Sequence, residues 1–149
     1  MKPLIVLFVV FALSIGIMWL AFASINYMLA GRIALAAMLV LTAFGHFKFV
    51  EGMEMMIPDF VPFKRFFVYS TGILEFLAAL GLLFDSTFEI TGLLLIIFFV
   101  LILPSNIQAS MRHINIEKGT LDGPGLSYLW FRVPLQILFI GWTYFVTLR

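Results

Sequence analysis

The sequence predicts an all-α protein built into a lipid bilayer, and three observations carry this prediction. Of 149 residues, 63% are hydrophobic and only 11% are charged, whereas soluble chains are about 45–50% apolar and about 25% charged. The apolar residues form long continuous runs, where the strands of a membrane barrel would alternate apolar and polar residues. Cysteine is missing from the sequence, which excludes disulfides and thiolate metal sites, and the net charge of +1 offers no basic surface to nucleic acid.

Five apolar runs are long enough to cross the membrane as helices, since about 20 residues of helix span the roughly 30 Å of hydrocarbon. The runs are residues 3–24, 27–49, 66–84, 90–109 and 128–148. Pro58 and Pro62 end any helix that continues from the second run. The side chains of residues 85–87 offer N-cap oxygens to the fourth. We therefore expect five transmembrane helices joined by short loops.

The first run has two interpretations. Lys2 gives a thin basic start, and Ala21-Phe22-Ala23 resembles a signal-peptidase site, as in a cleaved signal peptide. The apolar run is about 20 residues long, however, whereas the core of a signal peptide usually has about 7–15. This length favours a signal-anchor-like helix that stays in the protein, and cleavage is the alternative.

The positions of lysine and arginine predict the orientation of the helices. With five spans, Arg32 and Arg149 fall on one side of the membrane and a larger set of cations on the other. The richer side is expected to be cytoplasmic, so the N terminus lies inside and the C terminus outside the bacterial cytoplasmic (inner) membrane. The cytoplasmic cations are Lys2, Lys48, Lys64, Arg65, Arg112 and Lys118.

Glu75 is the charged residue that the membrane interior tolerates least. It lies nine residues from Phe66 and nine from Phe84, about 13 Å along the helix from either end. Ionisable residues at this depth usually face the protein interior, where they are neutral or paired. Glu75 is therefore either a structural hydrogen-bonding residue between helices or part of a functional site. Arg132 is its expected ionic neighbour, unless the long arginine side chain extends to water instead.

Polar residues of three other helices fall in the same half of the bilayer as Glu75. His46 lies near the end of the second run, Asn106 closes the fourth, and Arg132 and Gln136 share a face of the fifth. Five polar residues at compatible depth predict an inward-facing polar pocket in the cytoplasmic half of the bundle. Such a pocket is where a membrane protein usually holds a ligand or cofactor. For each residue alone, a structural hydrogen bond is the competing interpretation.

Two local features accompany these residues. Gly45 precedes His46 and is expected to let another helix approach closely. Pro104 leaves the carbonyl of Val100 without its usual donor, so the end of the fourth helix can be a kink held by its own side chains, including Asn106.

The loop between the second and third runs is rich in methionine. Met53, Met55 and Met56, together with His46, have the ligand types that bind Cu(I). The stretch 53–58 fits better as an interfacial segment whose apolar face lies among lipid headgroups. Haem ligation by two histidines would require His46 and His113, and His113 is expected to lie beyond the membrane edge. We therefore predict no metal site.

Short motifs in four of the runs resemble the DoxX-like family of small membrane proteins. The resemblance covers about residues 31–147 and follows the four helices of the family in order. The motifs of the first two helices are Gly45-His46-Phe47, Met56-Ile57-Pro58, Val61-Pro62, Val68-Tyr69, Gly72, Glu75 and Gly81-Leu82-Leu83. Those of the last two are Leu103-Pro104-Ser105-Asn106-Ile107, with serine where the family usually has alanine, then Phe131-Arg132-Val133-Pro134-Leu135-Gln136 and Trp142.

The resemblance implies a four-helix membrane domain over residues 25–149, with residues 1–24 as an extra N-terminal transmembrane helix. The family takes its name from the membrane subunit of a thiosulfate:quinone oxidoreductase, and some relatives are described in redox-stress complexes. The resemblance therefore implies a redox-associated subunit whose pocket binds a quinone- or lipid-like ligand. His46 and Glu75 would exchange protons with a quinone, and Asn106, Arg132 and Gln136 would hold its oxygens.

Other functions stay open at this point. No residue of the chain supplies an electron donor, so a redox role needs a partner protein in the membrane, and whether the chain is an enzyme is undecided. Distant animal relatives of the family act as chaperones or cargo receptors. The alternative is therefore a non-catalytic membrane chaperone, assembly protein or small hydrophobic ligand-binding protein. A transporter is a weaker third option, because transporters usually show inverted repeats and a chain of this length would have to form a homo-oligomer.

Overall fold

The computed structural model describes residues 2–149, and over this range the fold is helical, apart from one isolated bridge between Asn115 and Thr120. The elements are α1 (Lys2–Phe22), α2 (Tyr27–Lys48), α3 (Val50–Met56), α4 (Lys64–Gly81), α5 (Phe88–Met111), the 3-10 turn η1 (Gly125–Tyr128) and α6 (Leu129–Thr147). Four helices have the length and apolar composition of membrane spans: α1, α2, α5, and α6 together with η1. The predicted all-α fold is therefore confirmed.

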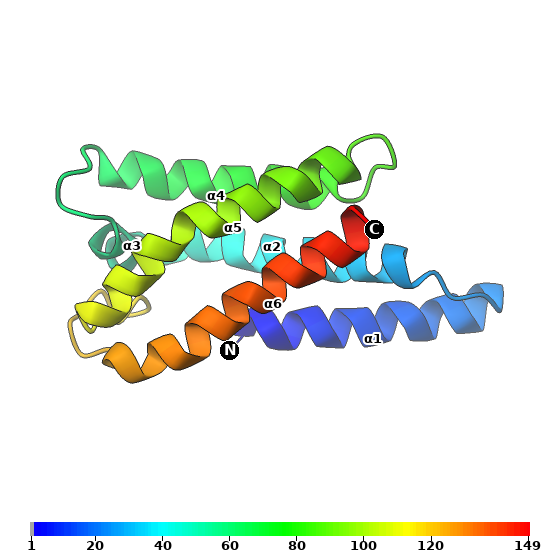
Figure 1. The fold of residues 1–149 in the computed structure, drawn as a ribbon, viewed down its shortest axis with the longest axis horizontal. Coiled ribbons are helices and arrows are strands. Elements are labelled where there is room, and N and C mark those ends of the chain that lie inside the picture. The colour runs from blue at the N-terminus through cyan, green and yellow to red at the C-terminus, as the bar shows by residue number, and fades with distance from the viewer. Residues whose placement is uncertain (1) are drawn as a thin grey trace.

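α4 corresponds to the third predicted run but differs from the four apolar helices. It has 18 residues and ends at Gly81, three residues before the predicted end at Phe84. It also carries three charged residues, Lys64, Arg65 and Glu75. Figure 1 shows α4 antiparallel to α2 and extending from one end of the bundle to the other. The crossing of the membrane by α4 stays a prediction.

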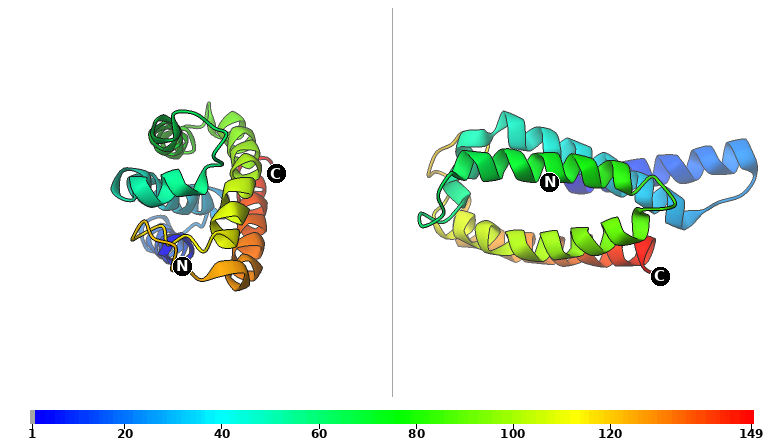
Figure 2. Two further views of the ribbon diagram at one scale, coloured as in Figure 1. Left: turned by 90° about the vertical axis from the view of Figure 1, so that its left-hand side faces the viewer. Right: turned by 90° about the horizontal axis from the view of Figure 1, so that it is seen from above.

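The helices form two layers, with α2 at the centre. Figure 2 shows α4, α2 and α1 in one layer and the antiparallel pair α5 and α6 in the other. α2 contacts helices of both layers, and small residues at its buried face allow the close approach. At Gly31, the indole Nε1 of Trp142 donates to the glycine carbonyl at 3.2 Å, and Val146 occupies the space that a side chain at Gly31 would need.

α1 lies beside α2 and remains largely exposed. Phe8 and Phe11 meet the ring of Trp142 edge-on, with centroid distances of 5.8 and 5.0 Å. Near the start of α1, the ammonium of Lys2 forms an ion pair of 2.7 Å with Glu117 in the loop after α5. The other end of α1 extends past the bundle (Figures 1 and 2). The helix is therefore attached mainly through its N-terminal half.

The loops at the predicted cytoplasmic end pack against one another. Met56 of α3 is buried against Ala109 and Ile114. Gly52 lies so close to Ile116 that a side chain at this glycine would collide with the Ile116 carbonyl. The prediction that stretch 53–58 turns its apolar face to lipid headgroups is therefore wrong for Met56, because the segment after α5 folds back and covers it.

The opposite end of the bundle contains Arg32, which the sequence places near the start of the second apolar run and which the structure buries. Arg32 is 7% exposed, its Nη1 donates to Asp85 Oδ1 at 3.3 Å, and its guanidinium lies 4.0 Å from the ring centroid of Phe88. The side-chain hydrogen bond that was predicted to cap the start of α5 is not formed by Thr87. Thr87 occupies the N-cap position, but its hydroxyl donates to the Gly81 carbonyl at 2.8 Å.

Candidate ligand-binding site

One narrow face of α4 is turned towards the rest of the protein, and Glu75 lies on it. The buried residues of α4 are Val68, Gly72, Glu75 and Ala79. They are spaced three or four apart, as one side of an α-helix requires. Glu75 is 5% exposed, so its predicted position inside the protein is confirmed.

His46 of α2 is the ionisable side chain that the structure places beside Glu75. Its Nε2 lies 3.6 Å from Glu75 Oε1. The two helices approach closely here because Gly72 has no side chain: a Cβ at this position would lie 2.7 Å from the Cβ of His46. Gly45 was expected to admit the neighbouring helix, but the nearest atom to a Cβ placed at Gly45 would belong to Met53 of α3, at 3.7 Å. The glycine that allows the approach is Gly72.

The other ring nitrogen of His46 contacts two groups of α4. Nδ1 lies 3.0 Å from the carbonyl oxygen of Val68 and 3.0 Å from the hydroxyl oxygen of Thr71. The Thr71 hydroxyl is also 2.9 Å from the Val68 carbonyl, to which it can donate. Sequence reasoning missed Thr71, although it lies four residues before Glu75 and therefore on the same side of α4.

Glu75 Oε2 is buried and has no hydrogen-bond partner among the described residues. Buried polar atoms in native proteins nearly always have a partner, and leaving one unpaired costs about 1–3 kcal/mol. A bound molecule that pairs with Glu75 Oε2 would therefore gain this free energy.

Asn106 and Gln136 form a second polar pair, between α5 and α6. Asn106 Nδ2 donates to Gln136 Oε1 at 3.3 Å, and Gln136 Nε2 donates to the Phe99 carbonyl at 2.6 Å. The carbonyl expected to need a donor was that of Val100, four residues before Pro104. The structure instead shows Gln136 of α6 donating to the carbonyl of Phe99, the residue before Val100. This hydrogen bond attaches the proline-containing end of α5 to α6.

Arg132 lies apart from both pairs. Its guanidinium is 5.5 Å from the ring centroid of Tyr128, and it forms no ion pair with Glu75 in the described part of the chain. The expectation that Arg132 is the ionic neighbour of Glu75 is therefore wrong. Arg132 is in the first turn of α6, and helical side chains lean towards the N-terminus of their helix. The guanidinium of Arg132 therefore lies near Tyr128, four residues earlier in the chain.

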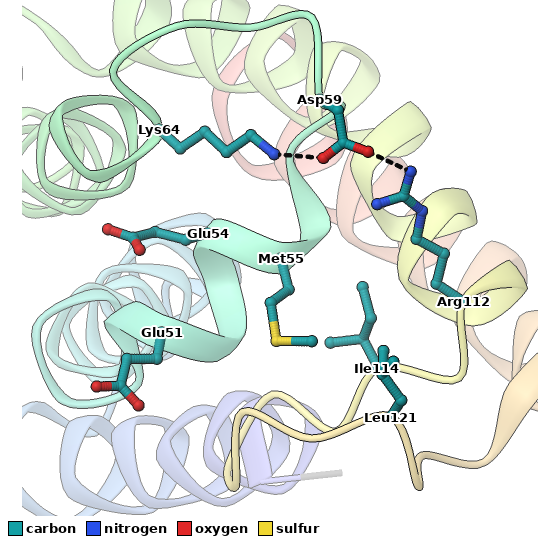
Figure 3. Close-up of a pocket in the computed structure, with 8 residues that line it drawn as sticks. All are labelled: Glu51, Glu54, Met55, Asp59, Lys64, Arg112, Ile114 and Leu121. Atoms are coloured by element: carbon teal, nitrogen blue, oxygen red, sulfur yellow. Dashed lines mark hydrogen bonds and ion pairs between the residues drawn. The ribbon is translucent and has the colours of Figure 1, made fainter.

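Two cavities lie at the loop end of the bundle, and none of the five predicted site residues lines either of them. The larger, of about 660 Å³, is bounded by α3, the start of α4 and the segment after α5 (Figure 3). In the wall of this cavity, the carboxylate of Asp59 accepts hydrogen bonds from Lys64 at 2.7 Å and from Arg112 at 2.6 Å. The other lining residues are Glu51, Glu54, Met55, Ile114 and Leu121.

The bridge at Asp59 predicts a pH-dependent attachment of this loop. Hydrogen bonds from Arg112 and Lys64 hold the pKa of Asp59 well below its ordinary value of 3.8. A depressed pKa in the folded state means that the stabilisation is present above about pH 4 and is lost as the pH falls further.

Replacing Asp59 by asparagine is therefore expected to speed proteolysis of the loop at about pH 7, and the difference from the parent protein should narrow below about pH 4. An acid-tolerant protease, with cleavage followed by mass spectrometry, provides the measurement. Glu89→Gln, an exposed change on α5, serves as the control. Equal cleavage of the parent protein and Asp59→Asn at pH 7 would contradict the role of the bridge.

The fold and its polar pairs define a class of protein: a helical membrane bundle in which a part-buried histidine lies beside a buried glutamate. Residues 35–147 match the family described as "Domain of unknown function (DUF8561)", and the chain belongs to this family. The matched range includes His46, Glu75, Asn106, Arg132 and Gln136 and leaves α1 outside. No curated protein and no solved structure matches the chain.

Proposed function

We propose that this protein is a redox-associated membrane subunit of the DoxX-like kind, which binds a quinone-like molecule at the pair formed by His46 and Glu75. The observation that carries the proposal is the buried Glu75 Oε2, which has no partner among the described residues and lies beside a histidine. The matched range of the DUF8561 family and the resemblance to DoxX-like proteins also cover the same four helices, α2, α4, α5 and α6.

The polar groups present suit the oxygens of such a ligand in their chemistry, and neither of the two cavities at the loop end reaches them. When bound, a quinone would supply two-electron redox chemistry. His46 and Glu75 can hold a proton at a place shielded from water, since their side chains are 17% and 6% exposed. Asn106 and Gln136 fix α5 against α6. The chain holds no cysteine, so a partner protein would deliver or remove electrons without passing them through a thiol of this protein.

Ligand binding can be tested on the purified protein in lipid nanodiscs. We expect solvent extraction to release a quinone and a short-chain benzoquinone or its quinol to raise the melting temperature. Glu75→Leu should lose the shift, whereas the exposed change Glu89→Leu should keep it. If no quinone is extracted and neither redox form changes the melting temperature, the proposal is wrong.

An assembly or chaperone role is the second candidate. It is favoured by the pair of Asn106 and Gln136, whose hydrogen bonds are made within the bundle and include the Phe99 carbonyl. In this case the polar residues serve helix packing. Co-purification of one membrane partner in stoichiometric amount, without bound quinone, would support this role.

We also propose that the protein lies in the bacterial cytoplasmic membrane with the N terminus inside and that α4 crosses the bilayer. The native chain has no cysteine, so single cysteines can be labelled without background. Phe60→Cys and Ser86→Cys flank α4 at exposed positions. A membrane-impermeant maleimide added to spheroplasts should label Ser86→Cys, and should label Phe60→Cys only after the membrane is opened. Labelling of both from outside would contradict the crossing of α4.

A further inference from the structure

The larger cavity at the loop end combines apolar walls with a charged rim. Its volume of about 660 Å³ is within the range of pockets that hold small ligands, which are mostly apolar with a few polar groups. The apolar lining comes from Met55 of α3 and from Ile114 and Leu121 of the segment after α5, whose side chains lie together in Figure 3. The cavity can therefore take an apolar chain.

The charged rim of this cavity has an excess of positive charge and unused donors. One carboxylate, that of Asp59, lies between the two cations Lys64 and Arg112. An ammonium has three N–H groups and a guanidinium has five, and the structure gives each cation only the acceptor Asp59 among the described residues. The rim can therefore hold a second anionic group, and its charge would then be balanced.

The two glutamates that line the same cavity do not cancel this charge at the rim. The Oε1 of Glu54 accepts from the Nε of Arg65 at 2.8 Å. The carboxylate of Glu51 lies near the loop at Gly119, where a Cβ would be 3.7 Å from Glu51 Oε2. Figure 3 shows both carboxylates on the side of α3 away from Arg112. The acidic groups and the guanidinium therefore lie on different sides of the cavity.

The rim lies where apolar helices leave the hydrocarbon layer. Arg112 directly follows Met111, the last residue of α5, and α5 has the composition of a membrane span. Phe63, next to Lys64, is 82% exposed, and Trp130, near the start of α6, is 86% exposed. Exposed aromatic residues at the ends of spanning helices are typical of the headgroup layer. The anionic groups that this layer offers are lipid phosphates.

We propose that this cavity binds an anionic phospholipid, whose phosphate accepts hydrogen bonds from Arg112 and Lys64 and whose acyl chain begins along Met55 and Leu121. Arginine and phosphate form strong charge-assisted hydrogen bonds, often through two nitrogens. Basic pockets between transmembrane helices are known to bind such headgroups. This lipid site is separate from the proposed quinone site and does not depend on it.

Three probes test the lipid site. The purified protein in detergent micelles is titrated with phosphatidylglycerol, phosphatidylcholine and glycerol phosphate, and native mass spectrometry counts the bound molecules. We expect phosphatidylglycerol to bind about tenfold more tightly than phosphatidylcholine, because the choline cation neutralises the phosphate. Glycerol phosphate has no acyl chain and should bind at least about tenfold more weakly than phosphatidylglycerol. Equal binding of these two would assign the cavity to a free phosphate ester and overturn the lipid proposal.

Variants of single cations locate the binding. Arg112→Gln should remove most of the preference for phosphatidylglycerol, whereas Arg112→Lys should keep most of it. Lys118→Gln is the matched control, because it removes an exposed cation at the same end of the bundle that does not line the larger cavity. The ratio of the two lipids is measured in one sample, so a loss of folded protein does not change it. Equal binding of the two lipids by the parent protein, or an equal loss of preference in Lys118→Gln and Arg112→Gln, would overturn the inference.

Discussion

Replacing His46 by leucine is expected to lower the free energy of unfolding by about 3 kcal/mol. The change removes the ionisable side chain that lies 3.6 Å from Glu75 Oε1 and leaves the buried Oε2 still without a partner among the described residues. Replacing His46 and Glu75 together by leucine removes the unpaired group and should restore most of the lost stability, because buried polar pairs can often be exchanged for apolar residues at little cost. Thermal unfolding in detergent, followed by tryptophan fluorescence, measures the three variants.

The single change Glu75→Leu completes a double-mutant cycle of the parent protein, the two single variants and the double variant. The stabilities of these four proteins give the coupling energy between His46 and Glu75. Glu89→Leu, at an exposed position of α5, is the control and should change the stability by no more than about 0.5 kcal/mol. If the double variant loses as much stability as the two single variants together, His46 and Glu75 do not form a coupled pair.

Replacing Gly31 by alanine is expected to cost about 2 kcal/mol, because the new Cβ would collide with a methyl group of Val146 on α6. The Cβ of Val146 lies 3.4 Å from the same position, an ordinary contact distance. The additional change Val146→Ala therefore removes the collision, and the double variant should lose less stability than the sum of the two single changes. Chemical denaturation in mixed micelles gives the free energies.

Gly141 provides the matched control for this prediction, since nothing lies within 4 Å of a Cβ built there. Gly141→Ala should leave the stability unchanged or raise it by up to about 1 kcal/mol, through the better helix propensity of alanine. Strict additivity of Gly31→Ala and Val146→Ala would show that α2 and α6 do not touch at this point.

The helices could be predicted from the sequence because continuous apolar runs are longer than any other element would need. The ends of α4 could not. α4 begins at Lys64 because Phe63 takes a left-handed conformation with φ of 54°. A large aromatic residue gives no signal for that conformation. The helix ends at Gly81, although apolar residues continue beyond it.

The depth of the candidate site residues in the bilayer could be predicted from the sequence, but the contacts between their side chains could not. Counting residues along each helix places Glu75, His46 and Arg132 in the same half of the bilayer, and it says nothing about rotation around the helix axis. The rotation depends on where helices meet, and α2 meets α4 at Gly72. This contact brings His46 to Glu75, whereas the direction of the Arg132 side chain takes it to Tyr128.

The charged contacts at the two ends of α4 make the attachment of this helix depend on ionic strength. At one end Asp59, with a side chain 68% exposed, binds Lys64 and Arg112; at the other Asp85, 93% exposed, binds Arg32. Dissolved salt screens such exposed pairs over a distance of about 8 Å at physiological concentration and over less at higher concentration. The apolar contacts of α1, α2 and α6 are not screened in this way. Salt therefore weakens the contacts of α4, the helix that carries Glu75, as well as the exposed pair of Lys2 and Glu117 at the start of α1.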